Sequence, residues 1–314
     1  MSDDLVPKRR WITRRGVLKL LGGSILGAFA LGAYAFGIEP GLRLTTTRYA
    51  FTPPQWTPGL ALRVVAIADI HACEPWMTTW HIERIVERAN ALEPDLIVLL
   101  GDYSAGMNIV TDYVHSSEWA PILGRLDAPL GTYAILGNHD WWEDKTAQRR
   151  GHGPTFGQLA LEANGVRVLE NETVRLEKDG HAFHLAGLGD QIALLPRERY
   201  GRTRWLGVDD LPKLTRELNE GEPTILLAHE PDIFPRVPDG VSLTLSGHTH
   251  GGQVRLFGHS PIVPSRFGDR YAYGHIIEEG RHLVVSGGLG CSIAPVRFGV
   301  PPEIVLLELG GETA

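Results

Sequence analysis

Three apolar runs in this chain each end on a short polar block, and this pattern restricts the fold more than any other feature. The runs are Leu62–Ala68, Leu96–Leu100 and Thr132–Leu136, and each has the length and composition of a buried strand. Between them, apolar residues recur at helical spacing from Thr78 to Leu92, and a second helix is expected from Glu118 to Leu126. Strands that alternate with helices predict parallel β-α-β units in an α/β fold.

The later part of the chain turns to strands. They are expected at Val166–Leu169, Val174–Leu176, Phe183–Ala186, Ile225–Leu227, Leu243–Leu245, Ala272–Ile277, Leu283–Val285 and Ile304–Leu309. The stretch Gln191–Gly207 has no clear periodicity and is interpreted as a surface loop.

The polar blocks carry oxygen and nitrogen donors that suit metal ions. In chain order the donors are Asp69, His71, Asp102, Asn138, His139, Asp140, His229, His248 and His250. Each block follows the carboxyl end of a predicted strand, where open α/β sheets place their sites. One block alone is weak evidence, because a Gly-Asp pair is usually a turn and a lone histidine is usually structural. Five blocks in one order are far more specific.

This donor set suits two divalent ions that share one carboxylate and lie about 3.5–4 Å apart. Imidazole and oxygen ligands without thiolate favour manganese, iron or zinc over calcium or magnesium, and manganese is the favoured ion. A site of this kind activates water for attack on a phosphate ester, and a remaining histidine can protonate the leaving oxygen.

The ordered blocks Asp-x-His, Gly-Asp, Gly-Asn-His-Asp, His and Gly-His-x-His resemble those of the calcineurin-like metallophosphoesterase superfamily over roughly residues 60–309. The runs Gly247–Gln253 and Gly288–Ile304 resemble one branch, of membrane-associated or twin-arginine-exported bacterial phosphoesterases. Some members of that branch hydrolyse UDP-2,3-diacylglucosamine in lipid A synthesis.

The resemblance implies a four-layer α/β/β/α sandwich of two mixed sheets in a metallophosphoesterase domain over residues 61–314. It also implies roles for individual side chains. Asp69, His71 and His250 would hold one metal ion, Asn138, His229 and His248 would hold the other, and Asp102 would bridge both. His139 would be the general acid, oriented by Asp140.

The N-terminal 38 residues are predicted to be an export signal or a membrane anchor. Arg14 and Arg15 precede an uncharged run from Leu20 to Ile38, as in twin-arginine signals. A plain basic flank of a membrane anchor is the alternative. The run is long enough to span a bilayer, and Ala33-Tyr34-Ala35 is a weak cleavage site. Residues 39–60 are expected to form a linker, and the body is expected to be periplasmic.

Charge bears on the partners of the protein. Residues 1–35 have a net charge of +4, which leaves −11 on the remainder of a chain whose total is −7. An acidic body has no electrostatic footprint for nucleic acid, so a nuclease is disfavoured. The expected partners are a small or lipid-linked phosphate ester and the membrane, and the oligomeric state stays open.

Several other residues have two interpretations each. Cys73 and Cys291 are expected to be part-buried apolar residues, although a disulfide between them is not excluded. Arg255, Arg266 and Arg297 are candidates for a substrate phosphate or for surface ion pairs. The tryptophans near the ligand blocks either ring the mouth of the site or anchor loops by packing; they are Trp76, Trp80, Trp141 and Trp142.

The sequence thus favours a two-metal phosphoesterase that cleaves a phosphodiester or pyrophosphate bond of an envelope or lipid-linked metabolite. The alternatives are a phosphomonoesterase or 5′-nucleotidase-like enzyme, and a UDP-2,3-diacylglucosamine hydrolase if the body faces the cytoplasm. A non-enzymatic metal-binding envelope protein is the least favoured.

Overall fold

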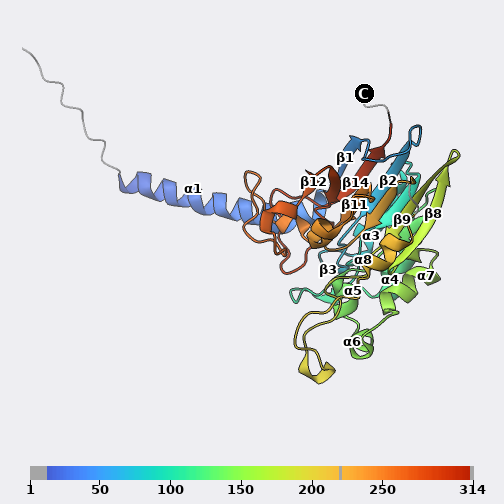
Figure 1. The fold of residues 1–314 in the computed structure, drawn as a ribbon. Helices are drawn as coiled ribbons and strands as arrows, with labels where there is room; N and C mark the ends of the chain where they lie inside the picture. Colours follow the sequence, from blue (N-terminus) through green and yellow to red (C-terminus); the bar gives the residue numbers. More distant parts are fainter. Residues whose placement is uncertain (1–12, 219–220, 312–314) are drawn as a thin grey trace, which may run out of the picture.

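Two six-stranded mixed sheets pack face to face in the computed structural model, which describes residues 13–218 and 221–311 (Figure 1). The first twelve residues of the predicted signal lie outside the described part. The first sheet has the order β1-β14-β2-β4-β6-β7 and the second β12-β13-β11-β10-β9-β8. The predicted sandwich of two mixed sheets is confirmed.

The first sheet contains the three apolar runs with which the sequence analysis began. Its strands are β1 (Thr45–Phe51), β14 (Glu303–Leu309), β2 (Leu62–Ile67), β4 (Leu96–Leu99), β6 (Thr132–Ala134) and β7 (Arg167–Val168). Strands β2, β4, β6 and β7 are parallel, and β14 runs antiparallel to β2. The carboxyl ends of the parallel strands therefore lie along one side of the sheet, and the polar blocks follow directly after these strand ends.

The second sheet comes from the later part of the chain. Its strands are β8 (Glu172–Lys178), β9 (His181–Gly187), β10 (Thr224–Leu227), β11 (Leu243–Ser246), β12 (Gly274–Glu278) and β13 (Arg281–Val285). Strands β9, β10, β11 and β13 are parallel, and β8 and β12 are antiparallel edges. A separate pair joins β3 (Cys73–Glu74) to β5 (Asp112–Tyr113).

Apolar side chains of the two sheets form a shared core. Val64 and Val98 of the first sheet lie in one buried cluster with Phe183 and Leu227 of the second. Burying this surface from both sides is the main force that holds the sheets together.

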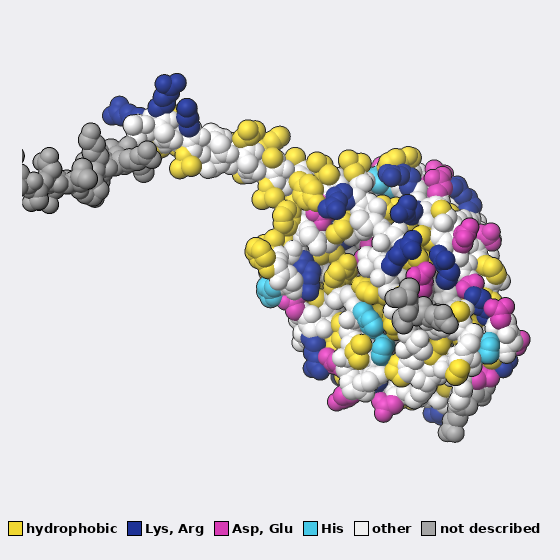
Figure 2. Space-filling model, turned by 90° about the horizontal axis from the view of Figure 1, so that it is seen from above, with side chains coloured by type: hydrophobic (Ala, Val, Ile, Leu, Met, Phe, Trp, Pro, Cys, Tyr) yellow, Lys and Arg dark blue, Asp and Glu magenta, His cyan; other side chains and the backbone are white. Residues whose placement is uncertain are grey.

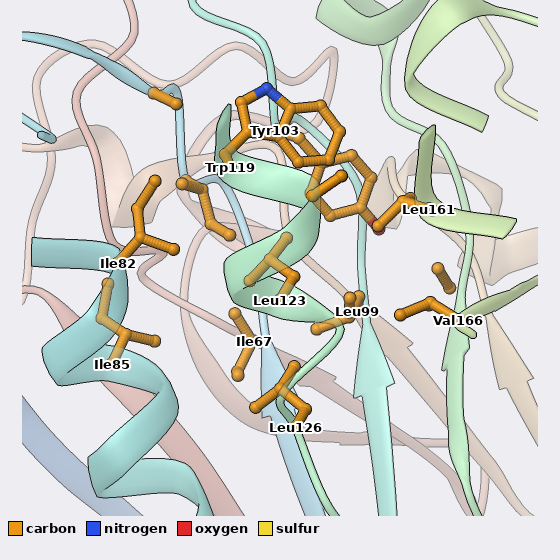
Figure 3. Close-up of a cluster of buried hydrophobic side chains, with 14 of the residues drawn as sticks. Ile67, Ile82, Ile85, Leu99, Tyr103, Trp119, Leu123, Leu126, Leu161 and Val166 are labelled. Carbon is orange, nitrogen blue, oxygen red and sulfur yellow. The ribbon is translucent and has the colours of Figure 1, made fainter. Parts of the chain in front are cut away.

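Helices cover the outer face of each sheet. On the first sheet lie α3 (Thr79–Asn90), α4 (Ser116–Leu123) and α7 (Phe156–Ala163), whose buried residues, such as Ile82 and Leu123, pack over Ile67 and Leu99 (Figure 3). On the second lie α8 (Leu211–Arg216) and the 3-10 turn Pro231–Arg236. Short helices α5 (Asn138–Trp142) and α6 (Lys145–Arg150) follow β6, and further 3-10 turns occupy Glu198–Tyr200, His250–Gly252 and Gly268–Tyr271.

The predicted linker over residues 39–60 is wrong. Residues Glu39–Leu42 form α2, and β1 pairs in parallel along its whole length with β14. Strand β1 escaped prediction because it is an edge strand with a polar, half-buried sequence whose partner lies more than 250 residues away. The folded body therefore begins directly after the apolar run.

The N-terminal helix α1 (Arg14–Ala33) projects from the body and continues through a π-helical turn, Tyr34–Ile38, into α2 (Figure 1). None of its residues is buried. It is the one helix among the described residues that is long and apolar enough to cross a membrane.

Candidate metal centre

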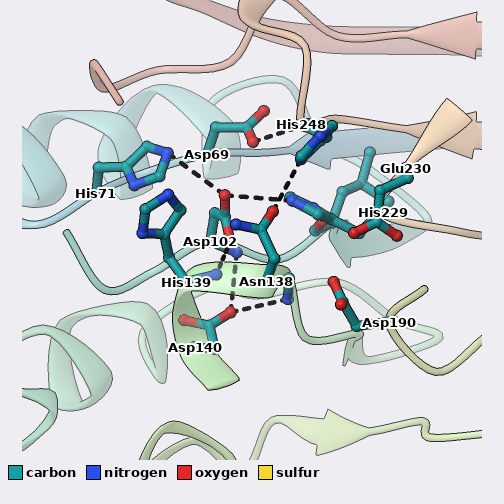
Figure 4. A network of polar contacts seen from close by, with 12 residues as sticks. Asp69, His71, Asp102, Asn138, His139, Asp140, Asp190, His229, Glu230 and His248 are labelled. Carbon is teal, nitrogen blue, oxygen red and sulfur yellow. Dashed lines mark hydrogen bonds and ion pairs between the residues drawn. The ribbon is translucent and has the colours of Figure 1, made fainter. Parts of the chain in front are cut away.

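The seven predicted ligands lie close together at the carboxyl ends of the parallel strands of both sheets (Figure 4). Asp69 follows β2, Asp102 follows β4, and Asn138 begins α5 after β6. From the second sheet, His229 follows β10 and His248 follows β11. Because the polar blocks come from strands of two packed sheets, the fold alone brings them together.

One group consists of Asp69, His71 and His250, whose donor atoms lie within 4.8 Å of one another. The Nε2 atoms of the two histidines are 3.0 Å apart, and His250 Nε2 lies 3.7 Å from Asp69 Oδ1. All three side chains are buried. The group has the size of a single ion site.

A second group consists of Asp102, His229 and His248, again within 4.8 Å. Asn138 Oδ1 joins it at 2.8 Å from His248 Nδ1. Asp102 Oδ2 lies 3.2 Å from His229 Nε2 and 3.5 Å from His71 Nε2. One carboxylate oxygen therefore lies between imidazoles of the two groups.

The hydrogen bonds of these imidazoles test whether cations fit the site. His71 Nδ1 lies 3.1 Å from the Ser104 carbonyl and His229 Nδ1 lies 2.7 Å from the Leu100 carbonyl, so each Nδ1 carries the proton and donates it. The Nε2 atom of each ring then points at the carboxylate of Asp102. Facing lone pairs of nitrogen and oxygen repel unless a positive charge lies between them. Burial lowers the pKa of His229, but the charge of Asp102 outweighs it and holds that pKa well above its usual value, so a proton supplies this charge at His229 in the metal-free protein. A divalent cation would supply it for both rings.

The protonation behaviour of the buried groups points the same way. Burial lowers the pKa of His71 to about 3 and holds the pKa of His250 well below its usual value, so both imidazoles are neutral. Burial also raises the pKa of Asp69 to about 7, and its Oδ2 has no hydrogen-bond partner among the residues that the structure describes. A bound cation stabilises the charged form of a buried carboxylate whose oxygen lacks a hydrogen-bond partner.

The backbone at the site adopts an uncommon conformation. Twelve described non-glycine residues have positive φ, and five are candidate ligands: Asp69, His71, Asp102, His248 and His250, with φ between 47° and 68°. Such residues are rare and concentrate at functional sites. Gly137 also permits close approach, because a Cβ there would lie 2.4 Å from Asp102 Oδ1.

Asp140 does not contact the imidazole that it was expected to orient. Its carboxylate instead accepts hydrogen bonds from four backbone N–H groups, those of Asp102, Tyr103, Ser104 and Gly137, at 2.9–3.1 Å. The acidic side chain nearest the His139 ring is that of Glu143, whose Oε1 lies 3.6 Å from Nδ1. The predicted contact between Asp140 and the His139 imidazole is therefore wrong, although Asp140 holds the backbone of the site through these four hydrogen bonds.

A further buried carboxylate pair lies beside His229. Asp190, Glu230 and His229 place donor atoms within 4.8 Å, and Glu230 Oε2 accepts from the backbone and side chain of Gln191. Burial and the neighbouring Glu230 hold the pKa of Asp190 well above its usual value. Sequence reasoning missed this pair, although Glu230 directly follows a predicted ligand.

The tryptophans divide between the two interpretations. Trp141 is fully buried in the core outside the first sheet, so it does not line the mouth. The Trp142 ring lies 5.0 Å from that of His139 and 4.7 Å from that of Trp205. Trp205 belongs to the predicted loop Gln191–Gly207, which thus comes close to His139.

The three arginines do not present a free phosphate-binding group. Arg297 is fully buried, donates to the carbonyls of Gly287, Gly290 and Val300, and places Nη2 3.2 Å from His250 Nδ1. Both of its sequence-based interpretations are wrong. Arg255 and Arg266 form the expected ion pairs, with Asp269 and Asp232.

Cys73 and Cys291 are both buried free thiols. Burial raises the pKa of Cys73 to about 11, so it is a protonated apolar residue. This agrees with the interpretation that the sequence favoured.

Comparison with known proteins places this arrangement in a family. Residues 62–252 match the model of the calcineurin-like phosphoesterases. The chain is 31% identical over 306 residues to the uncharacterised metallophosphoesterase YkuE of Bacillus subtilis, covering 95% of this chain and 98% of that protein. It is 28% identical over 288 residues to an uncharacterised metallophosphoesterase of Aquifex aeolicus, covering 92% and 97%.

The chain belongs to the calcineurin-like phosphoesterase family, and it is a metal-dependent phosphoester hydrolase. The family binds two divalent ions and acts on phosphate esters. A bovine transmembrane protein with a metallophosphoesterase domain is 30% identical over 260 residues, covering 79% of this chain and 53% of that protein.

Proposed function

We propose that this protein cleaves a phosphodiester or pyrophosphate bond of an envelope or lipid-linked metabolite on the outer face of the cytoplasmic membrane. The observation that carries the catalytic part is the position of the Asp102 carboxylate between the Nε2 atoms of His71 and His229. This geometry favours a bridging ligand between two cations.

In this proposal Asp69, His71 and His250 would hold one ion. Asn138, His229 and His248 would hold the other, and Asp102 would be shared by the two sets. When bound, two divalent ions polarise the phosphoryl oxygens and lower the pKa of water enough for attack at neutral pH. The nitrogen and oxygen donors favour manganese, iron or zinc, and we propose manganese.

His139 holds the proton that the leaving oxygen needs. Its backbone N–H donates to Asp102 Oδ1 at 2.8 Å, which fixes the residue beside the bridging carboxylate. Its ring packs against His71 and Trp142, at centroid distances of 5.0 Å for each. Burial lowers the pKa of His139, but Asp102 and Glu143 outweigh that effect and raise it in the metal-free protein. The position of the imidazole beside the Asp102 carboxylate suits it to general acid catalysis.

The N-terminal helix and its flanks support the proposed location. Arg14, Arg15 and Lys19 lie at its N-terminal end, and basic residues remain on the cytoplasmic side of a membrane. We therefore propose that twin-arginine export places the body outside, with α1 retained as an anchor. A substrate that exists only in the cytoplasm, such as a UDP-linked sugar, is then excluded.

The test is hydrolysis of bis-p-nitrophenyl phosphate by the full-length protein loaded with Mn²⁺. Asp102→Asn and His139→Ala should each lower kcat by about a hundredfold or more. Asp112→Asn and His152→Ala, at exposed positions, are the matched controls and should keep the rate of the parent protein. Unchanged rates in the first two variants would exclude the mechanism, and a preference for p-nitrophenyl phosphate would indicate a phosphomonoesterase.

A further inference from the structure

The apolar run of the N-terminal helix ends directly on the folded body. Leu20–Ile38 comprises nineteen uncharged residues, which as a helix span about 28 Å, close to the ~30 Å hydrocarbon core of a bilayer. The next residue, Glu39, is buried, and its Oε1 accepts from the backbone N–H of Val300 at 2.9 Å. A helix of this kind in a membrane leaves no spacer between the lipid and the body.

Contacts between the helix and the body fix which face of the body is at the lipid. The backbone N–H of Arg297 donates to the carbonyl of Ala35 at 2.9 Å. The Tyr34 ring meets the Phe298 ring edge to face at 6.0 Å, and Arg43 donates to the Tyr34 hydroxyl. The segment around Arg297 and Phe298 is therefore held at the base of the helix.

A hairpin with an exposed aromatic side chain at its tip pairs with that segment. Phe298 exchanges backbone hydrogen bonds with Gln253 and Arg255, and the chain then turns tightly between Leu256 and His259. Phe257 lies at the tip with φ of 50°, and its side chain is fully exposed. A bulky residue rarely adopts positive φ, because this backbone conformation costs free energy. In water the fully exposed side chain of Phe257 makes no packing contacts with the described residues that would offset the cost.

Other exposed apolar side chains surround the base of the helix. Gln253 Nε2 binds the carbonyls of Ala294 and Val296, which places the neighbouring Ile293 beside the hairpin. Figure 2 shows hydrophobic side chains gathered where the helix meets the body. We define the helix-base patch as Phe36, Ile38, Leu42, Leu256, Phe257, Ile262 and Ile293, which are 45–107% exposed.

We propose that the helix-base patch rests in the surface of the bilayer that α1 enters, with Phe257, Ile262 and Ile293 inserted among the lipids. Continuity with a membrane-length helix selects lipid as the occupant, because the patch surrounds the point where the chain passes from hydrocarbon to body. Aromatic and aliphatic side chains insert about 5–10 Å into such an interface. This inference rests on the proposed retention of the anchor.

The placement has a consequence for the substrate. Phe257 follows the candidate ligand His250 by seven residues, a chain that spans at most about 25 Å when fully extended. Arg297 also joins the two regions, since its side chain contacts His250 while its backbone holds Ala35. The metal centre is therefore joined to the proposed lipid contact by short segments of chain, which favours a phosphate ester in the head-group layer of the same membrane as the substrate.

The test uses the full chain in phosphatidylcholine–phosphatidylglycerol vesicles, with an environment-sensitive fluorophore on single introduced cysteines. The native thiols Cys73 and Cys291 are buried and do not compete for the label under native conditions. Labels at Phe257→Cys and Ile293→Cys report the patch, and Leu26→Cys reports the helix. Leu159→Cys on α7, at the end of the body away from α1, is the exposed control (Figure 1).

Quenching by lipids with brominated acyl chains should be strong at position 26. It should be at least about twofold greater at positions 257 and 293 than at 159, because interfacial insertion brings the labels near the acyl chains. Quenching at 257 and 293 no greater than at 159 would overturn the proposal, and so would an unquenched position 26. Hydrolysis of the soluble diester by the same variants separates this result from a failure of the proposed catalytic function.

Discussion

Asp140 shows how much of the metal centre depends on a residue that does not face the metals. Its carboxylate accepts from the backbone of three consecutive residues after β4 and from Gly137 before α5. These bonds hold Asp102 at positive φ and fix the loop that carries His139. Charge-assisted bonds of this kind are stronger than neutral ones, and their loss leaves buried N–H groups without acceptors.

Asp140→Asn is therefore expected to destabilise the protein by about 2 kcal/mol or more. The amide would turn a donor toward N–H groups that need an acceptor. Chemical denaturation of the metal-free protein measures the loss, with Asp112→Asn at an exposed position as the control. If Asp140→Asn kept the parent stability and changed only the pH dependence of catalysis, Asp140 would instead act on His139.

At the residue scale, the sequence predicted the site residues that belong to motifs and missed those that do not. The five ordered blocks selected the seven predicted ligands, whose donor atoms lie close together in the structure. Glu143, Asp190 and Trp205 contribute to the surroundings of the site, but no spacing rule marks them. Their positions depend on how α5 and the loop 191–207 pack, which local sequence does not determine.

At the scale of elements, the buried strands were predictable from the sequence, and the edge strand β1 was not. Strand β4 is a continuous apolar run, and β2 is interrupted only by Arg63, because both faces of these strands are covered. Strand β1 alternates exposed and half-buried residues, and its Pro- and Gly-rich surroundings resemble a linker. Its pairing with β14 is a long-range event that no local pattern reports.

A histidine pair on β12 and β13, packed against Phe51 of β1, links stability to pH. His275 Nε2 lies 3.0 Å from His282 Nδ1, and the Phe51 ring stacks on both at 4.2 and 5.2 Å. Burial lowers the pKa of His282, and burial together with the His282 charge lowers that of His275. The folded state therefore binds fewer protons than the unfolded state below the ordinary histidine pKa of about 6.5.

It follows that this pair adds stability above about pH 6.5 that is lost as the pH falls toward the lowered pKa values. In the double variant His275→Gln, His282→Gln, the melting temperature should decline less steeply between pH 7 and pH 5 than in the parent protein. His152→Gln, in an exposed loop, controls for the loss of a histidine. A double variant with the same pH slope as the parent would contradict the prediction.

At the scale of the whole molecule, the metal centre is where the two sheets meet. Asp69, Asp102 and Asn138 come from the first sheet, and His229 and His248 from the second. Each sheet alone holds an incomplete set of donors, so packing of the sheets and assembly of the site are one event. The N-terminal helix is attached to the same assembly through Arg297, which touches both Ala35 and His250.

The most direct measurement is anomalous diffraction from crystals soaked in Mn²⁺. The account predicts two peaks about 3.5–4 Å apart, with the Asp102 carboxylate touching both and the other six side chains divided three and three between them. Crystals of Asp102→Asn, soaked in the same way, should show weaker peaks. A single peak or an empty site in the parent protein, or two ions without Asp102 between them, would contradict the account.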